Sequence, residues 1–338
     1  KATRKAKPTR QQPQTNRPHH TRKARNRLRV PKLQLVRRLA GAVLTTGILL
    51  TAGCESGGRT GGVTGDIGRT YGIEVGEIEP PQSLAVVLDR VNRNAERMTF
   101  LLRGGGVKAT GEYLEKGKLE NYELRGTLLY RKPTDLFLEL QHSVAGKMEV
   151  GSNTEEFWVW KRIGNERYWW GLHQDLRGQD AVDMPLRPDD LVDVLGLQPL
   201  RPPTGDRGFK VLSDRYELRY TERSPSGWQY VTRVVHVDRR PPYLVREITR
   251  HYPSGERRMI ARIANYQPVA GSDVLAPRWI DITWPTDGGH MNLVIREMER
   301  YAHARAERKF VSPRARGRID GHEMERVMPT PSPAALAP

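Results

Sequence analysis

The chain has 338 residues, a net charge of +17 and one cysteine. A single cysteine excludes a cysteine-rich zinc site. The charge at first favours nucleic-acid binding, but residues 1–53 hold 14 Lys and Arg and no Asp or Glu, which leaves about +3 for the rest. The composition therefore gives the body of the protein no nucleic-acid-binding character.

Residues 1–38 are basic and rich in Pro, Gln and Asn, with no apolar periodicity. Such a segment cannot bury enough apolar surface to offset the entropy lost on ordering, so the composition predicts disorder. A basic arm that binds nucleic acid remains the alternative for this segment.

Arg37 and Arg38 lead into the apolar and small residues 39–53. About fifteen residues are too few for a helix to cross a hydrocarbon core. Positive residues, a short apolar run and small residues before a cleavage site are typical of a secretory signal peptide. The arginine pair also raises twin-arginine export, although the flanking residues fit that pathway poorly.

The end of this run, Leu50-Thr51-Ala52-Gly53-Cys54, resembles the bacterial lipobox. The resemblance implies that Cys54 becomes the first residue of the mature chain and is lipidated, with acyl chains such as palmitate holding it in a membrane. The alternative is a free cysteine buried as a small hydrophobe, but Cys54 is followed by Glu, Ser and Gly rather than by core residues.

Four segments follow from composition. Residues 1–53 are the basic leader and signal peptide, and residues 54–81 are the lipidated cysteine with a flexible Gly-rich tether. Residues 82–311 form the folded domain, and residues 312–338 are a charged, then Pro- and Ala-rich tail that we expect to be disordered.

Two helices are predicted in the folded domain. In residues 82–98 the apolar side chains recur at helical spacing and form one stripe, which contains Leu84, Val87, Leu88 and Val91. The second helix lies in residues 187–197, where Pro188 and Asp189 favour a start and Gly196 favours a stop.

The remainder predicts about thirteen strands, because short runs of aromatic and branched residues alternate with Gly, Asn, Pro and Lys turns. Short connections between successive strands favour antiparallel pairing. The fold class is therefore mostly β with a few helices, either a barrel with helices on one face or a sandwich.

No motif indicates catalysis. His322-Glu323 lacks the second histidine of a metalloprotease helix, and His290 fits a hairpin position. Asp189-Asp190 and Glu155-Glu156 are interpreted as a helix cap and a turn. We therefore expect no enzyme, no metal and no cofactor.

Apolar side chains form stripes along several predicted strands. In Phe157-Trp158-Val159-Trp160 both strand faces are apolar, so this strand is either covered on both sides or lines an apolar cavity. Such stripes build either a packed core or a cleft for acyl chains. The candidate lining residues of the cleft are Leu124, Leu128, Leu136, Leu138, Leu140, Trp158, Trp160, Ile280, Ile282 and Trp284.

The chain resembles the LolA and LolB family of outer-membrane lipoprotein carriers and receptors over about residues 80–300. The resemblance lies in the order of helices and strands and in four segments, RVNRNAERM, RGTLLYRKPTDLFLEL, GSNTEEFWVW and LAPRWIDITWP. It implies a half-open antiparallel β-barrel whose helices cover a concave apolar face. No residue of this chain matches the cavity arginine of the carrier, and the chain is longer than those proteins.

The predicted function is an anchored envelope lipoprotein, facing the periplasm at the outer rather than the inner membrane. Its partners are the membrane, through lipidated Cys54, and lipid or lipoprotein acyl chains, with possible roles in lipoprotein sorting or lipid transfer. The helix at 82–98 is the predicted lid. The alternative is a packed structural module, tethered to the envelope, that binds a protein partner.

Overall fold

The computed structural model describes residues 76–115, 118–144, 146–163, 166–174, 187–205, 207–224, 227–286, 288–317 and 324–326. The predicted leader, signal peptide, Cys54 and most of the tether lie outside the described residues. None of the helices in the described ranges has the length and apolar character needed to span a bilayer.

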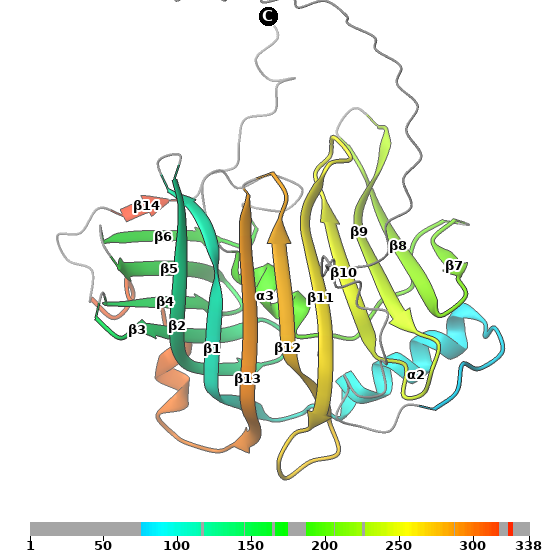
Figure 1. Cartoon of the computed structure of the whole chain (residues 1–338), viewed down its shortest axis with the longest axis horizontal. Coiled ribbons are helices and arrows are strands. Elements are labelled where there is room, and N and C mark those ends of the chain that lie inside the picture. Colours follow the sequence, from blue (N-terminus) through cyan, green and yellow to red (C-terminus); the bar gives the residue numbers. More distant parts are fainter. Residues whose placement is uncertain are drawn as a thin grey trace, which may run out of the picture. The chain divides into compact units, whose positions relative to one another are not determined.

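The described strands form one sheet (Figure 1), in the spatial order β14-β6-β5-β4-β3-β2-β1-β13-β12-β11-β10-β9-β8-β7. All thirteen predicted strands are present, and β14 is additional. Their bounds are β1 Leu101–Glu115, β2 Lys118–Arg131, β3 Asp135–His142, β4 Gly146–Ser152, β5 Glu156–Ile163, β6 Arg167–Leu172, β7 Phe209–Val211, β8 Arg215–Arg223, β9 Gln229–Asp238, β10 Val245–His251, β11 Arg257–Pro268, β12 Leu275–Trp284, β13 Gly289–Tyr301 and β14 Met324–Arg326.

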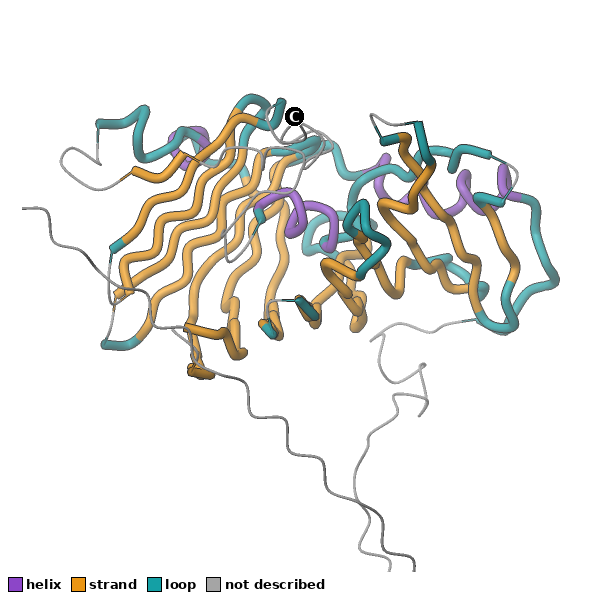
Figure 2. The backbone as a smooth tube through the Cα atoms, turned by 90° about the horizontal axis from the view of Figure 1, so that it is seen from above, coloured by secondary structure: helices purple, strands orange, loops and turns teal. Residues whose placement is uncertain are grey.

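The sheet is antiparallel except where β14 pairs with β6, and it is open. Its two edges are β14 and β7, and within the described ranges no strand pairing joins them. Figure 2 shows the twist, since some strands run in the plane of the view while others are seen end-on, with α3 beside them. The predicted mostly-β, half-open architecture with a few helices is confirmed.

The two α-helices agree with the predicted ones. α2 spans Leu84–Arg97, and its apolar stripe is buried against the sheet. α3 spans Pro188–Val194, with Pro188 at its start. The helix ends before Gly196, whose φ of 64° is a conformation that glycine adopts without the cost borne by other residues.

The C-terminal segment differs from the predicted disordered tail. The short 3-10 helix η1, Ala306–Phe310, places Phe310 against Leu129 and Phe137. Beyond it, Ser312 is fully buried and the Arg314 guanidinium lies 4.0 Å from the ring centroid of Trp170. Residues 312–317 therefore pack on the sheet, because its aromatic surface gives them apolar and cation–π contacts.

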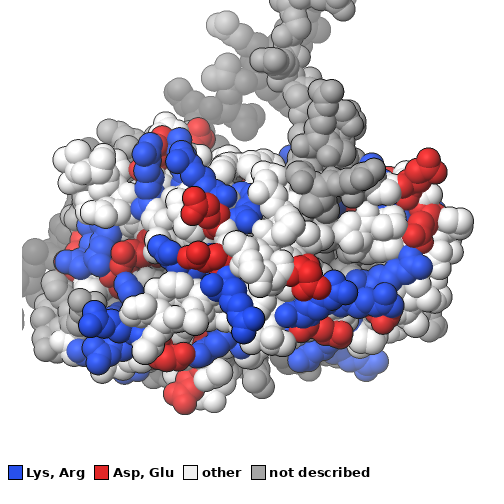
Figure 3. Space-filling view, turned by 90° about the horizontal axis from the view of Figure 1, so that it is seen from below, with Lys and Arg blue, Asp and Glu red and all other residues white. Residues whose placement is uncertain are grey.

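Charged side chains of both signs lie on the face of the molecule that is seen from below in Figure 3. In Figure 3 the Lys and Arg side chains are interspersed with Asp and Glu. Several face each other across strands, as in the ion pair of Arg103 with Glu299 at 2.7 Å and that of Lys108 with Glu123 at 3.0 Å. Exposed ion pairs of this kind contribute little to the free energy of folding, but a surface with charges of both signs favours solubility.

Candidate functional site

We define the inner face of the sheet as the face that packs against α2 and α3. On this face one row of side chains runs without interruption from β2 to β6. Register places Leu128, Leu138, Val150, Val159 and Trp169 side by side on successive strands. None of the five is more than 4% exposed. The row is a continuous apolar surface five strands wide.

A second apolar row crosses the other half of the sheet. Ile248 of β10 pairs with Ala261 of β11, which pairs with Ile282 of β12, which pairs with Met291 of β13. All four side chains are buried in the same core cluster as the first row. The inner face is therefore apolar across both halves of the sheet.

Eight of the ten predicted lining residues belong to this cluster. They are Leu124, Leu128, Leu136, Leu138, Leu140, Ile280, Ile282 and Trp284. The predicted lid residues lie with them, with Val87, Leu88 and Val91 buried in the cluster and Leu84 half-buried against it. The structure thus brings most of the predicted site together.

Trp158 and Trp160 do not share this face. They form a separate cluster with Tyr168 on the outer face, since their neighbour Val159 points inward and side chains alternate along a strand. The Trp158 ring lies over Gly151, where an added Cβ would approach ring atoms to 2.1 Å. β5 is apolar on both faces because both faces are covered.

The inner face also holds residues that were not among the predicted lining. Val150, Val159 and Trp169 complete the first row. Strand alternation could have identified these three residues. If Leu138 points inward, each residue paired with it in register on the neighbouring strands also points inward. Trp158 and Trp160 were predicted to line the cleft because they are large and apolar, but residue type does not indicate which face of a strand a side chain occupies.

Polar contacts at two asparagines fix α2 over this surface. Asn92 donates to the Leu200 carbonyl at 2.9 Å and accepts from the Leu200 amide at 2.7 Å. Asn94 makes the same pair of bonds with the backbone of Leu275, at 2.8 and 2.7 Å. The helix is therefore held at its middle by four hydrogen bonds as well as by its apolar stripe.

α3 is bound to the sheet by ion pairs whose carboxylates are buried. The Arg258 guanidinium lies 2.6 Å from Asp190, and that of Arg250 lies 2.8 Å from Asp193. Arg233 also pairs with Asp193. These arginines come from the neighbouring strands β11, β10 and β9, so the sheet presents three cations to two carboxylates of one helix.

Burial and charge act in opposite directions in this cluster. Burial raises the pKa of the Asp190 carboxyl, although Arg258 opposes that shift. Burial would lower the pKa of the Arg250 guanidinium, but the carboxylates of Asp193, Asp190 and Asp189 raise it instead. Arg250 therefore stays charged, whereas burial opposes ionisation of the Asp190 carboxyl.

The interpretation of Asp189-Asp190 as a helix cap is wrong. The residue at the start of α3 is Arg187 rather than an aspartate, and no side chain caps the helix. Asp190 is instead buried against β11. Its partner Arg258 lies 68 positions away in the chain, a distance over which local sequence signals carry no information about pairing.

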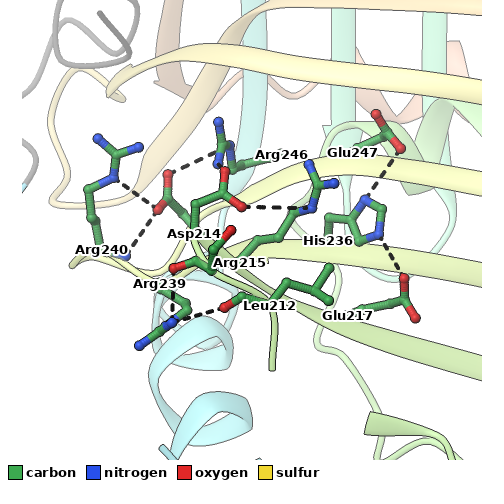
Figure 4. A network of polar contacts seen from close by, with 11 residues as sticks. Leu212, Asp214, Arg215, Glu217, His236, Arg239, Arg240, Arg246 and Glu247 are labelled. Carbon is green, nitrogen blue, oxygen red and sulfur yellow. Dashed lines mark hydrogen bonds and ion pairs between the residues drawn. The ribbon is translucent and has the colours of Figure 1, made fainter. Parts of the chain in front are cut away.

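Two further features lie on the outer face. A pocket of about 330 Å³ is lined by Trp228, Tyr230 and His251 together with neighbouring residues. Nearby, a polar network contains His236 between two glutamates (Figure 4). Within the described ranges, no group of three or more His, Cys, Asp or Glu side chains is arranged to hold a metal ion. His290 lies at the start of β13 with its Nε2 2.6 Å from Asp281.

No family model and no curated protein matches the chain. Among solved structures, the chain is similar to a LolA superfamily protein from Nitrosomonas europaea, with a TM-score of 0.42, 11% identity and coverage of 69% of this chain and 100% of that one. A putative outer membrane lipoprotein-sorting protein domain from Vibrio parahaemolyticus has a TM-score of 0.42 and 12% identity, over 66% and 95% of the two chains. A DUF1329 family protein from Desulfovibrio piger has the same TM-score and identity over 70% and 100%.

At this level of similarity we base the proposals below on the chain's own residues.

Proposed function

We propose that the protein is a membrane-anchored bacterial envelope lipoprotein whose β domain binds a hydrophobic ligand without catalysis. The ligand is lipid or lipoprotein acyl chains, which lie between the inner face of the sheet and the helices α2 and α3. The anchor is Cys54, and the domain faces the periplasm, at the outer rather than the inner membrane. A role in lipoprotein sorting or lipid transfer follows from such binding.

The observation that supports this proposal is the pair of apolar rows on the inner face, one on each half of the sheet. One layer of sheet presents it, and only two helices of 14 and 7 residues in the described ranges lie over it. Transfer of a twelve-carbon chain from water to such a surface contributes about 10 kcal/mol, at roughly 0.8 kcal/mol per methylene. That gain is large enough to offset the loss of several helix–sheet contacts when a ligand displaces a helix.

A second candidate is favoured by the burial of this face. Leu138 and Ile282 are each 0% exposed, as in a packed core. In that case the domain is an interaction module tethered to the envelope, and it binds a protein partner through its outer surface.

Matched substitutions on β3 separate the two candidates. Leu138 points inward and Phe137 outward, and both are buried. We would measure binding of the uncharged probe N-phenyl-1-naphthylamine to residues 55–338, with Leu138→Asn and Phe137→Asn as the variants. Acyl-chain binding predicts at least a tenfold loss of affinity for Leu138→Asn and little change for Phe137→Asn. A parent protein that does not bind the probe would favour the interaction module.

The anchor has its own test. A Cys54→Ser variant of the full chain, expressed in a bacterial host, should leave the membrane fraction. The parent chain should begin at Cys54 when its mature N-terminus is analysed. A mature chain that retains residues 1–38 would favour the basic-arm alternative.

A further inference from the structure

The three arginines that pair with α3 have more N–H donors than they have hydrogen-bond acceptors. Arg233, Arg250 and Arg258 face two directly paired carboxylates, Asp190 and Asp193. Arg258 is only 8% exposed, and its Nη1 has no hydrogen-bond partner. The Nε of Arg233 is likewise buried without a partner. The Oδ2 of Asp190 is also buried without a hydrogen-bond partner, so the unpaired groups include one acceptor. The direct ion pairs nevertheless set three cations against two carboxylates, which leaves the cluster able to accept one more negative charge.

The nearby charged groups do not remove this imbalance. Asp189 contributes negative potential at Arg250 but makes none of the three direct ion pairs. Arg187, at the start of α3, adds a further positive charge near Asp190. Replacing such buried ion clusters by apolar residues is often neutral or stabilising, so stability alone does not account for three arginines on this face.

The cluster also adjoins the apolar surface. Arg233 and Arg250 are paired in register on β9 and β10, and Arg250 is paired with Met259 of β11. The next inner-face row, beginning at Ile248, is the second apolar row described above. A ligand lying along that row would bring its end to the arginines.

We propose that Arg233, Arg250 and Arg258 bind the anionic head of the amphiphile whose chain lies on the inner face, and that the aspartates of α3 occupy this place when the head does not. The proposal rests on the proposed function and names its ligand class, an acyl chain with a carboxylate or phosphate head. Guanidinium groups suit both heads, since they donate paired hydrogen bonds to either anion. The anion takes the acceptor positions of Asp190 and Asp193, and α3 is released.

The test compares dodecanoate, dodecyl phosphate and dodecanol as competitors of N-phenyl-1-naphthylamine on residues 55–338. The three share one chain and differ in the head. We expect at least one of the two anions to compete at least tenfold more strongly than dodecanol. Inorganic phosphate is the fourth competitor, and displacement of the anions but not of dodecanol by phosphate would show that the head site also accepts a free anion.

Two variants should act in opposite directions. Arg233→Gln removes one cation while Arg250 still pairs with Asp193, and it should abolish most of the preference for anions without changing the affinity for dodecanol. Asp190→Asn removes the competing carboxylate and should strengthen anion binding several-fold. A merely structural cluster would not give this opposite pair of effects.

Controls keep the outcome interpretable. The double variant Asp190→Asn/Arg258→Gln replaces a charged pair by a neutral one, and it should fold and lose the preference. Arg219→Gln, on the outer face of β8, should change nothing. Equal affinity for anions and dodecanol in the parent would overturn the inference and leave the proposed function standing. Failure of all the amphiphiles to compete with a bound probe, or failure of the probe itself to bind, would overturn both.

Discussion

At the scale of single residues, His236 links two carboxylates on the outer face of the sheet (Figure 4). Its two ring nitrogens lie 3.3 Å from Glu217 and 3.3 Å from Glu247. The hydrogen bond with His236 lowers the pKa of the Glu247 carboxyl, and burial only partly opposes that shift. A carboxyl group whose pKa is lowered in the folded state stabilises the fold at pH values above the ordinary glutamate pKa. This stabilisation is lost as the pH falls through the pKa of the folded state.

Glu247→Gln should therefore lower the free energy of unfolding at pH 7 by up to about 1 kcal/mol, as expected for a partly exposed pair. The difference from the parent should shrink as the pH falls below about 4.5, where the unfolded carboxyl also takes up its proton. Urea unfolding at a series of pH values measures this. Glu256→Gln, in an exposed turn, is the control, and a difference that stays constant with pH would contradict the assignment.

At the scale of elements, α2 depends on the two asparagines that bind backbone groups outside the helix. Asn94→Ala should lower the free energy of unfolding by about 1–3 kcal/mol, because it leaves the backbone of Leu275 without its two bonds. If α2 is the lid, the same change should speed uptake of N-phenyl-1-naphthylamine several-fold in stopped-flow fluorescence. Arg93→Ala is the matched control, since its pair with Asp89 is exposed and contributes little. Lost stability with unchanged uptake would mean that α2 is not the lid.

The elements were predictable from the sequence to different degrees. The stripe from Leu84 to Val91 and the Pro188 and Gly196 signals placed both helices, because helix periodicity and end signals are local. The strands were also predictable from local signals, namely short runs of aromatic and branched residues that are separated by turn residues. The buried role of Asp190 was not predictable, since it depends on Arg258, which is distant in sequence. The face occupied by Trp158 follows from strand alternation only once Leu138 is known to point inward.

At the scale of the whole molecule, the C-terminal segment belongs to the folded domain. Arg314 pairs with the buried Glu156 at 3.1 Å, and the fully buried Ser312 lies beside it in the chain. A chain that ends at residue 311, the boundary expected from composition, loses these contacts. It should be less stable than a chain that ends at 326 by about 2–4 kcal/mol, because Glu156 loses its partner and Trp170 its cation.

Urea unfolding of the two truncated chains measures that difference. Equal stability would mean that residues 312–317 lie on the sheet without stabilising it. Increased binding of an apolar dye to the shorter chain would accompany the expected result, since the aromatic outer face of β5 and β6 becomes accessible.

The central claim is that the inner face of the sheet holds acyl chains. It is tested most directly by purifying residues 55–338 without detergent from a bacterial host and measuring co-purified lipid by mass spectrometry. Because the leader and Cys54 are missing, any lipid found is bound by the domain and is not the anchor. The account predicts about one amphiphile per chain in the parent and a large loss in Leu138→Asn, with Phe137→Asn retaining it. A parent protein that carries no lipid and takes up none when acyl chains are added would contradict the claim.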